Sequence, residues 1–448
     1  MTKPYWTKQL PKRWSVERLR HVVEIANSNV DKKSYDDGSP VRLCNYTDVY
    51  YNEYITDDLD FMNATATPSE IQRFKLGPGD VIITKDSESW DDIAVPACVG
   101  EELVNVVCGY HLTLMRTKRR QMTGRFLLRA LQAQGVKEQF WLAANGVTRF
   151  GLGQQGMKDA LLPVPPISIQ NTIVSFLDEK TAQIDELIAK KEQLIELLEE
   201  KRAALINRAV TKGLNPDVPM KDSGVPWIGE IPQHWDVSRL GFLADEWGGS
   251  TPAKDNMDYW KGEIPWVSPK DMKTFEICGS QDHVTEAALA QLTLLPPSCV
   301  LMVVRGMILA RTVPIGITTV PVTINQDMKA LCPRQGIEAR FLAFSLVGFQ
   351  ESLLSHVEES GHGTKALRSD QWRQFSVPVP TADEQREIVV YIEGAERKRK
   401  NTIRKLESQV SKLVEYRQSL ITAAVTGQID VTEEPTDISE QELAGATA

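Results

Sequence analysis

The sequence predicts an α+β protein built as an internal repeat, with two mixed α/β domains separated by a coiled coil of two long helices. Three observations lead to this fold class. A stretch with the character of one long helix occurs twice, at 167–213 and at 381–428. A segment of short apolar runs divided by turn residues precedes each copy, which is typical of a mixed sheet. The two preceding segments have few identical residues when aligned, so the same repeated fold would carry two different surfaces.

The repeat is measured by two constant offsets in residue number. An offset of 215 aligns the two helical stretches without a gap and pairs Gln170 with Gln385. An offset of 221 aligns the residues before each variable segment and pairs Trp14 with Trp235. The duplication therefore extends over both halves of the chain, and function must be sought in a pair of related domains.

The composition is that of an ordinary globular protein. The chain has 448 residues, 42% of them hydrophobic and 25% charged, with a net charge of −9. No apolar run approaches the roughly 18 residues of a transmembrane helix, and the first residues lack the apolar core of a signal peptide. The six cysteines are scattered without a Cys-x-x-Cys pair, which predicts reduced thiols in a cytoplasmic protein rather than a disulfide framework or a zinc site.

The acidic balance argues mildly against a nucleic-acid-binding protein. Much of the acid, however, is concentrated in the helical stretch 178–200 and in the tail 430–442, where it would not face DNA. A local basic surface, not the sum over the chain, decides contact with phosphates.

The elements expected in the first half are strands, one helix and a loop. Strands are predicted at 41–44, 79–84, 94–99, 104–108 and 112–116, followed by a helix at 123–133 and a polar loop at 144–156. The Pro-rich segment 161–166 is extended, because a residue before proline avoids the α region. It leads into the first long helix, which Gly213 and Pro216 end.

The second half repeats this order. Strands are predicted at 264–267, 300–304, 315–320 and 328–332, and a helix begins near Glu338. The predicted organisation is a first domain at 1–160, a long helix at 161–213, a linker at 214–235, a second domain at 236–376, a second long helix at 377–429, and an acidic, disordered tail at 430–448.

Both long helices carry a narrow heptad seam, which suits a coiled coil. The apolar seam positions are Ile173, Leu177, Ile184, Leu187, Leu194, Leu198 and Leu205 in the first helix, and Ile388, Ile392, Leu406, Leu413 and Leu420 in the second. Polar members such as Lys191 and Gln409 interrupt the seams. The simplest arrangement packs the two helices on each other; the alternative is that each packs on its own domain as an ordinary amphipathic helix. A helix of this length spans roughly 60 Å, and an antiparallel pair would act as a spacer between two recognition surfaces.

The sequence contains no recognisable catalytic motif. The sequence lacks the Gly-x4-Gly-Lys-Ser/Thr phosphate loop, the quartet of an amino-methyltransferase, and any histidine spacing of a metal site. This favours a binding protein over an enzyme.

Several polar loops that follow predicted strands are candidates for contact with DNA. In the first segment they contain Lys85, Ser87, Trp90, Tyr110, His111, Arg116, Lys118, Arg119, Thr148 and Arg149. In the second segment they contain Trp266, Lys270, Arg305, Gln326, Thr364 and Lys365. Loops that combine donors, acceptors and an aromatic side chain can read base edges, and basic turns can contact phosphates. Each has a plain structural alternative: Trp90 could be buried, the turn at 116–120 could be merely solvated, and the turn at 109–111 could belong to the core.

The sequence also resembles the specificity subunit of Type I restriction–modification enzymes. The resemblance is carried by KDSGVPWIGEIPQHW at 221–235, by the two PVP-x4-Q segments before the long helices, by the helix ends AVTKG and AVTGQ, and by 361–388. It covers nearly the whole chain except the acidic tail.

This resemblance implies two target-recognition domains separated by an antiparallel coiled coil, and a bipartite double-stranded DNA target with an unspecified spacer. It implies two methyltransferase subunits and, in the restricting complex, two restriction subunits as partners, with no membrane association. S-adenosylmethionine, ATP and magnesium would then bind the partners, and this chain would hold no cofactor and perform no catalysis. The competing hypothesis is a coiled-coil scaffold that organises proteins without reading DNA.

Overall fold

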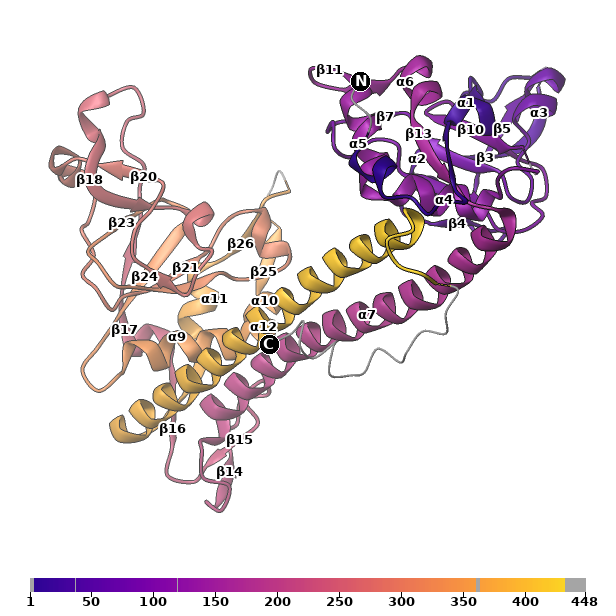
Figure 1. The fold of residues 1–448 in the computed structure, drawn as a ribbon. Coiled ribbons are helices and arrows are strands. Elements are labelled where there is room, and N and C mark those ends of the chain that lie inside the picture. The colour runs from indigo at the N-terminus through magenta and orange to yellow at the C-terminus, as the bar shows by residue number, and fades with distance from the viewer. Residues whose placement is uncertain (1–3, 37, 119, 360–362, 432–448) are drawn as a thin grey trace. The chain divides into compact units, whose positions relative to one another are not determined.

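The structure is a computed structural model that describes residues 4–36, 38–118, 120–359 and 363–431 (Figure 1). It contains two compact units, Met1–Glu192 with Leu406–Ala448, and Gln193–Lys405. Each unit holds one α/β domain and a part of both long helices, α7 (Ile167–Lys212) and α12 (Ala382–Val425). Among the described residues, no helix is long and apolar enough to cross a membrane.

The first domain precedes α7 in the chain. Its strands are β1 (Ser15–Arg18), β2 (Val23–Asn27), β3 (Ser39–Cys44), β4 (Tyr54–Ile55), β5 (Met62–Ala66), β6 (Val81–Thr84), β7 (Asp86–Ser87), β8 (Pro96–Val99), β9 (Val106–Cys108), β10 (Leu112–Thr117), β11 (Ala144–Gly146), β12 (Phe150–Leu152) and β13 (Leu161–Val164). Its helices are η1 (Tyr5–Lys8), α1 (Leu19–Val22), α2 (Tyr46–Tyr50), α3 (Pro68–Phe74), α4 (Gly124–Gln132), α5 (Gln134–Ala143) and α6 (Gln154–Asp159).

The second domain lies between α7 and α12 in the chain. Its strands are β14 (Met220–Asp222), β15 (Glu230–Pro232), β16 (Asp236–Arg239), β17 (Ala244–Gly248), β18 (Trp260–Val267), β19 (Glu276–Ile277), β20 (Asp282–Val284), β21 (Val300–Val303), β22 (Ile315–Thr318), β23 (Thr323–Ile324), β24 (Met328–Pro333), β25 (Val357–Glu359), β26 (Lys365–Leu367) and β27 (Ser376–Val379). Its helices are α8 (Leu240–Leu243), η2 (Met257–Tyr259), η3 (Pro269–Asp271), η4 (Glu286–Ala290), η5 (Met307–Ala310), α9 (Ala339–Gly348), α10 (Gln350–Ser355) and α11 (Ser369–Gln374).

The two larger sheets have the same topology in both domains. A five-stranded sheet has the order β2-β10-β6-β8-β4 in the first domain and β17-β24-β21-β22-β19 in the second. A three-stranded sheet has the order β5-β3-β9 in the first and β20-β18-β23 in the second. Corresponding strand pairs also agree in direction, since β4–β8 and β19–β22 are parallel within otherwise antiparallel sheets. The predicted α+β class with mixed sheets and an internal repeat is confirmed, even where the sequences diverge.

The core of each domain continues onto the ends of the long helices. In the first unit, Ile173 and Leu177 of α7 and Leu420 of α12 belong to the same apolar cluster as the residues of α4. In the second unit, Ile388 and Ile392 of α12 join Ile206 of α7 and the core of the domain. Each long helix therefore contributes one end to each domain core, which differs from the alternative in which each helix packs only on its own domain.

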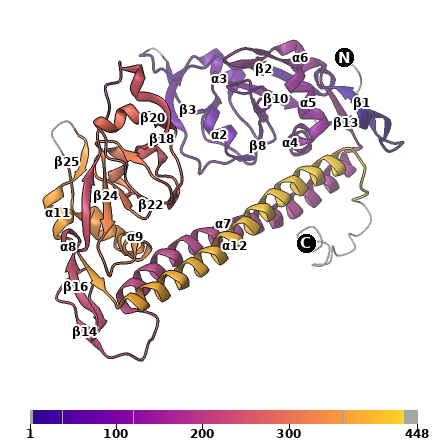
Figure 2. The same cartoon turned by 90° about the vertical axis from the view of Figure 1, so that its left-hand side faces the viewer.

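The middle parts of the helices pack on each other, so that α7 and α12 lie side by side in both views (Figures 1 and 2). In the first unit, Asp185 pairs with Arg417 and Lys191 with Gln409. In the second unit, Glu199 pairs with Arg399 and Arg202 with Glu396. In each unit the residue number rises along α7 while it falls along α12, so the pair is antiparallel. The predicted packing of the two helices is confirmed.

The apolar seam is buried at most of its predicted positions. Ile184, Leu406 and Leu413 are buried, and Leu187, Leu198 and Leu205 are partly buried. Leu194 is 43% exposed, so the seam is open to solvent at that position. The remaining seam residues pack in the domain cores near the helix ends. They are Ile173, Leu177, Ile388, Ile392 and Leu420.

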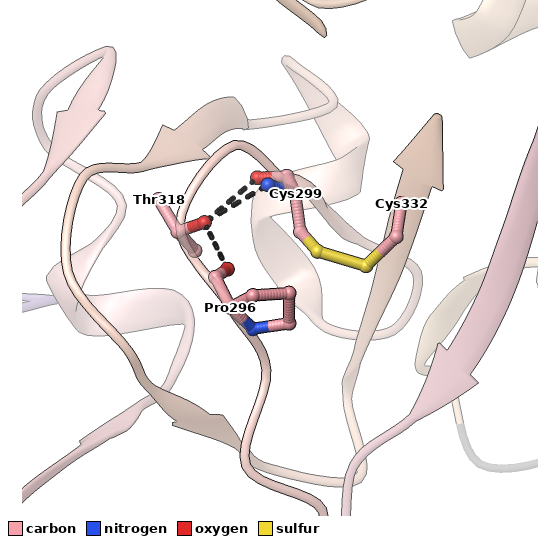
Figure 3. The surroundings of a disulfide bond; sticks show 4 residues. All are labelled: Pro296, Cys299, Thr318 and Cys332. Carbon is pink, nitrogen blue, oxygen red and sulfur yellow. Dashed lines mark hydrogen bonds between the residues drawn. A yellow bond between two sulfur atoms is a disulfide. The ribbon is translucent and has the colours of Figure 1, made fainter. Parts of the chain in front are cut away.

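Two predictions about the chain are wrong. The segment 144–156 is no loop: it forms the hairpin β11–β12 and the start of α6, because β12 pairs with β7 as well as with β11. The six cysteines are not all free, because Cys299 and Cys332 form a disulfide (Figure 3). The antiparallel register of β21 and β24 places these two residues opposite each other, with Cα atoms 4.3 Å apart. Most of the predicted acidic tail, 432–448, lies outside the described residues.

Candidate nucleic-acid interface

Three chain segments meet at one end of the five-stranded sheet in the first domain. β6 and β10 are antiparallel with Thr84 opposite Leu112, so the residue after β6 and the residue before β10 lie together. The backbone N–H of Lys85 donates to the carbonyl of His111 at 3.1 Å. The N–H of Leu152 in β12 donates to the carbonyl of Lys85 at 2.9 Å. The segment after β6, the turn before β10 and the hairpin β11–β12 thus form one backbone frame, which we call the recognition frame.

The recognition frame of the first domain brings together four side chains that the sequence analysis singled out. The Lys85 ammonium lies 4.4 Å from the centre of the Tyr110 ring, a cation–π contact. The His111 ring packs edge-on against Tyr110 with centroids 4.9 Å apart. His111 Nδ1 lies 2.9 Å from a carboxylate oxygen of Asp86 and 3.3 Å from the Arg149 guanidinium. The result is a group of two cations, an imidazole and an aromatic ring, in which Tyr110 and Arg149 are exposed and Lys85 and His111 are partly buried.

The neighbouring candidates differ in accessibility. Tyr110 and Trp90 are each 51% exposed, so Trp90 is not a core residue, although its ring meets Trp141 edge-on. Thr148 is exposed at the hairpin turn, beside Val147, which is 90% exposed. Ser87 is buried, and its hydroxyl accepts a hydrogen bond from the N–H of Ser89 at 3.2 Å, which holds the turn. Ser87 shapes the loop rather than facing a ligand.

The basic turn after β10 lies at the opposite end of that strand. The Arg116 guanidinium is held by the carboxylate of Asp80 and by the backbone carbonyls of Arg73 and Lys75. The Lys118 ammonium donates to the carbonyl of His21 at 2.8 Å. These bonds hold Arg116 and Lys118 on protein acceptors, so neither side chain is merely solvated. Arg119 lies outside the described residues.

The second domain repeats the recognition frame with the same backbone bonds. The N–H of Val304, after β21, donates to the carbonyl of Asp327 at 2.8 Å. The N–H of Leu367 in β26 donates to the carbonyl of Val304 at 2.9 Å. Val304 therefore corresponds to Lys85, and the turn before β24 corresponds to the turn before β10.

The side chains on the two frames are different. Gln326 takes the place of Tyr110, and Asp327 takes the place of His111. The strand pairing aligns Leu367 with Leu152, so Thr364 corresponds to Arg149. The Lys365 ammonium lies 2.7 Å from the Glu359 carboxylate. Arg305 is exposed and forms an isolated bridge with Ala366 of the hairpin.

A cleft of about 900 Å³ opens beside the recognition frame of the second domain. It lies along β18 and β20 and is lined by Trp266, Lys270 and Gln326 among others. Trp266 is 8% exposed, and its indole N–H donates to the carbonyl of Ser250 at 3.0 Å. The Asp282 carboxylate, 2.6 Å away, raises the pKa of Lys270. The cleft therefore joins three of the predicted residues in one concave surface.

The same cleft contains residues that sequence reasoning missed. Lys254, Lys261 and His283 line it as well. Lys261 has a left-handed backbone with φ of 64°, at the irregular pairing of β18 with β20 between Trp260 and Ile264. The sequence does not predict this bulge, because the residues around it do not alternate between apolar and polar as a regular strand does. Backbone strain of this kind is common at binding sites.

The two strands that lead to the recognition frame are also linked at their opposite ends, and the link differs between the domains. In the first domain, the Asp80–Arg116 ion pair joins the residue before β6 to the end of β10. In the second domain, the Cys299–Cys332 disulfide occupies the equivalent place between β21 and β24. Thr318 accepts from the N–H of Cys299 at 3.0 Å and donates to the carbonyl of Pro296 at 2.9 Å (Figure 3). An ion pair in one domain and a disulfide in the other thus link the same two positions of the sheet.

No group of three or more His, Cys, Asp or Glu side chains suited to a metal ion occurs within the described part of the chain. Burial raises the pKa of the Cys98 thiol to about 12, so this residue is not an activated nucleophile. The arrangement offers hydrogen-bond donors, acceptors and aromatic faces on loops, which is chemistry suited to binding.

Comparison with known families identifies one matching domain model, described as the Type I restriction modification DNA specificity domain. It matches twice, at residues 11–197 and 232–410. The EcoR124I/EcoR124II specificity subunit of Escherichia coli is 31% identical over 231 residues, which are 51% of this chain and 52% of that protein. A putative specificity subunit named MjaX, from Methanocaldococcus jannaschii, is 21% identical over 423 residues, 91% of this chain and 93% of that protein. The match to the EcoR124I/EcoR124II subunit thus spans about half the length of that relative.

Solved structures share the fold. A chain from a study of complex assembly and conformational transition of the type I R-M system superposes with a TM-score of 0.72 at 17% identity, covering 94% of this chain and 99% of that chain. The HsdS subunit from Thermoanaerobacter tengcongensis superposes with a TM-score of 0.55 at 17% identity, covering 94% and 98%.

Proposed function

The chain belongs to the Type I restriction–modification DNA specificity family, and from that premise we propose that its two domains read the two halves of a bipartite double-stranded DNA target. The single observation that carries this proposal is the duplicated recognition frame. The same backbone bonds present Lys85 and Tyr110 in one domain and Val304 and Gln326 in the other. Base edges are read by the side chains set on such a frame, so two unlike sets of side chains select two unlike half-sites.

The residues divide into two chemical roles. Lys85 and Arg149 in the first domain, and Arg305 and Lys270 in the second, supply cations for phosphates or guanine edges. Tyr110, Trp90 and the amide of Gln326 supply faces and hydrogen bonds toward the bases. Gln326 suits adenine, since an amide can bond the two polar groups on that base edge. The antiparallel pair α7–α12 would act as the spacer that sets the distance between half-sites.

The partners and cofactors follow from the same premise. We propose that the chain assembles with two methyltransferase subunits and, in a restricting complex, with two restriction subunits, in the cytoplasm. S-adenosylmethionine, ATP and magnesium would bind those partners, and this chain would supply sequence recognition and assembly without catalysis.

The test is a map of methylated adenines in DNA modified by the assembled complex. We expect a gapped motif whose first half changes in a Lys85→Ala/Arg149→Ala variant while the second half stays the same. A Lys270→Ala/Arg305→Ala variant should change only the other half. If both variants methylate the same motif as the unmodified chain, with equal efficiency, the competing hypothesis of a protein scaffold that does not read DNA is favoured instead.

A further inference from the structure

The segment after β21 forms a short turn, η5, beside the recognition frame of the second domain. The residue before it is Gly306, whose φ of 134° lies where almost only glycine is found. The backbone N–H of Gly306 donates to the carbonyl of Lys365 in β26 at 3.0 Å. The side chain of Leu309 is buried in the core of the domain. A backbone bond on one side and the core on the other therefore hold η5 in place.

The turn presents two large apolar side chains to solvent, which we call the apolar tip. Met307 is 66% exposed and Ile308 is 41% exposed. Arg305 and Arg311 precede and follow the tip. Both are exposed, and neither forms an ion pair with another residue that the structure describes. The stretch 304–313 contains no acidic residue. A ligand suited to this surface combines apolar with anionic groups.

The apolar tip lies next to the turn that carries Gln326. The backbone N–H of Arg305 donates to the carbonyl of Asp327, the residue after Gln326, at 3.2 Å. Met307 follows two residues after Arg305. A DNA duplex that presents a base edge to Gln326 would therefore have the apolar tip beside it.

The first domain has a segment of equal length in this place, with opposite chemistry. The N–H of Thr84 donates to the carbonyl of Val95 at 3.1 Å, and the N–H of Val303 donates to that of Pro314 at 3.1 Å. The stretch 305–311 therefore corresponds to 86–92 without a gap, and the latter contains four acidic and no basic residues. The fold accepts either set of side chains, so it does not require an apolar tip.

On the premise of the proposed function, we propose that Met307 and Ile308 select a thymine in the second half-site through its 5-methyl group. Among the four bases, only thymine presents a methyl group in the major groove. Contact with this methyl group removes apolar surface of both partners from water, which is favourable. Arg305 and Arg311 pair with phosphates on either side of the thymine.

Replacement of thymine by uracil tests this contact, because it removes only the methyl group. The complex assembled with the unmodified chain is titrated with duplexes that carry the mapped motif, in which each thymine of the second half-site is replaced in turn by deoxyuridine. We expect one replacement to raise Kd about fourfold, the effect of leaving one methyl group unburied. With Met307→Ala/Ile308→Ala, the thymine and uracil duplexes should bind with equal Kd.

Phe242→Ala is the matched control. Phe242 is an apolar residue of the same domain and is 67% exposed. It lies at the opposite end of β24, where its carbonyl accepts from Arg334 at 3.3 Å. This variant should keep the fourfold difference between the two duplexes.

Three results would overturn the proposal while leaving the proposed function intact. The first is a gapped motif whose second half contains no thymine, or none whose replacement changes Kd. The second is a difference between thymine and uracil that persists in Met307→Ala/Ile308→Ala, because other residues would then read the methyl group. The third is loss of assembly in this variant, because η5 would then contact a protein partner. Equal binding of all DNA sequences by the complex would contradict the proposed function itself.

Discussion

The Lys191 ammonium of α7 donates a hydrogen bond of 2.8 Å to the side-chain carbonyl of Gln409 of α12, so two polar interruptions of the helical seams meet each other. Polar pairs inside an apolar seam fix the register of a coiled coil at some cost in stability. The pair therefore offers a test of what sets the alignment of the two helices.

We expect Gln409→Leu to lower the free energy of unfolding by about 1–2 kcal/mol, because the partly buried Lys191 ammonium loses its acceptor. The double variant Lys191→Leu/Gln409→Leu should recover this loss, since apolar residues suit the seam. Urea denaturation measures both values. A double variant less stable than the single one would show that the pair stabilises the helices and does not only fix their register.

Gln170 and Gln385 should be needed equally for the attachment of each long helix to its domain. Both are fully buried, and their side-chain carbonyls accept from the N–H groups of Thr123 and Glu338 at 2.9 and 2.8 Å. Their amide nitrogens each donate to two backbone carbonyls. We expect Gln→Ala at either position to cost roughly 2–4 kcal/mol, because several buried groups lose partners.

Hydrogen exchange measured by mass spectrometry distinguishes the two variants. Gln170→Ala should increase exchange in the first unit, and Gln385→Ala in the second. The exposed Gln183→Ala on α7 serves as the control and should change stability by less than about 0.5 kcal/mol. Equal effects of all three variants would argue against the buried glutamines as specific anchors.

Loss of the Cys299–Cys332 disulfide should destabilise the second domain alone. The two residues are 33 apart in sequence, and closing a loop of that length stabilises a fold by about 3.7 kcal/mol. Cys299→Ala/Cys332→Ala should lower the unfolding midpoint of the second unit in denaturant, with the first unit unchanged. The exposed free thiol Cys278 gives the control variant Cys278→Ala. No difference between the two variants would mean that the bridge contributes no stability.

Substitutions on the first recognition frame should separate binding from stability. We expect Lys85→Ala or Arg149→Ala to weaken binding of the assembled complex to its DNA by about 1–3 kcal/mol, roughly 5- to 150-fold in Kd. Arg116→Ala should lower stability instead, because its guanidinium holds Asp80 and two backbone carbonyls. Titration of labelled duplex at fixed salt measures Kd. Stronger loss of binding in Arg116→Ala than in Lys85→Ala, with the fold intact, would place the interface at the other end of the sheet.

Glu384 should make the second unit sensitive to acid. Burial by itself raises the pKa of this carboxyl, but hydrogen bonds from Trp235, His234 and Thr381 outweigh burial and lower its pKa to about 2. A carboxyl with a lowered folded-state pKa adds stability above its unfolded value of about 4.5. That stability is lost as the pH falls from about 4.5 toward 2. In unfolding followed by fluorescence, Glu384→Gln should reduce the loss of stability between pH about 4.5 and 2. An unchanged loss of stability would contradict a lowered pKa of Glu384.

The regular parts of this chain were predictable because their patterns are local. The period of the long helices, the alternating strands and the repeat offsets depend on neighbouring residues, and the structure places β3, β6, β10, β21 and β24 where the apolar runs predicted strands. The hairpin β11–β12 was missed because its third strand, β7, lies more than fifty residues earlier in the chain. The disulfide was missed because only the register of β21 with β24 brings its cysteines together.

The candidate site was foreseen in part for the same reason. The sequence indicated loops after strands and so identified Lys85, His111 and Arg149. It could not show that Arg116 faces Asp80, or that Lys261 enters a cleft, since both depend on strand pairing at a distance.

The sequence by itself determined the duplication, the α+β class, the two long helices and the family, because these rest on periodicity and on residues repeated at constant offsets. Only the tertiary structure decided which side chains share a frame. Register and turn geometry bring Tyr110 and Gln326 to equivalent places, although the two residues differ in chemistry and occur in segments with few residues in common. It also decided that Glu384 caps the start of α12, because a cap depends on which segments meet at the end of a helix.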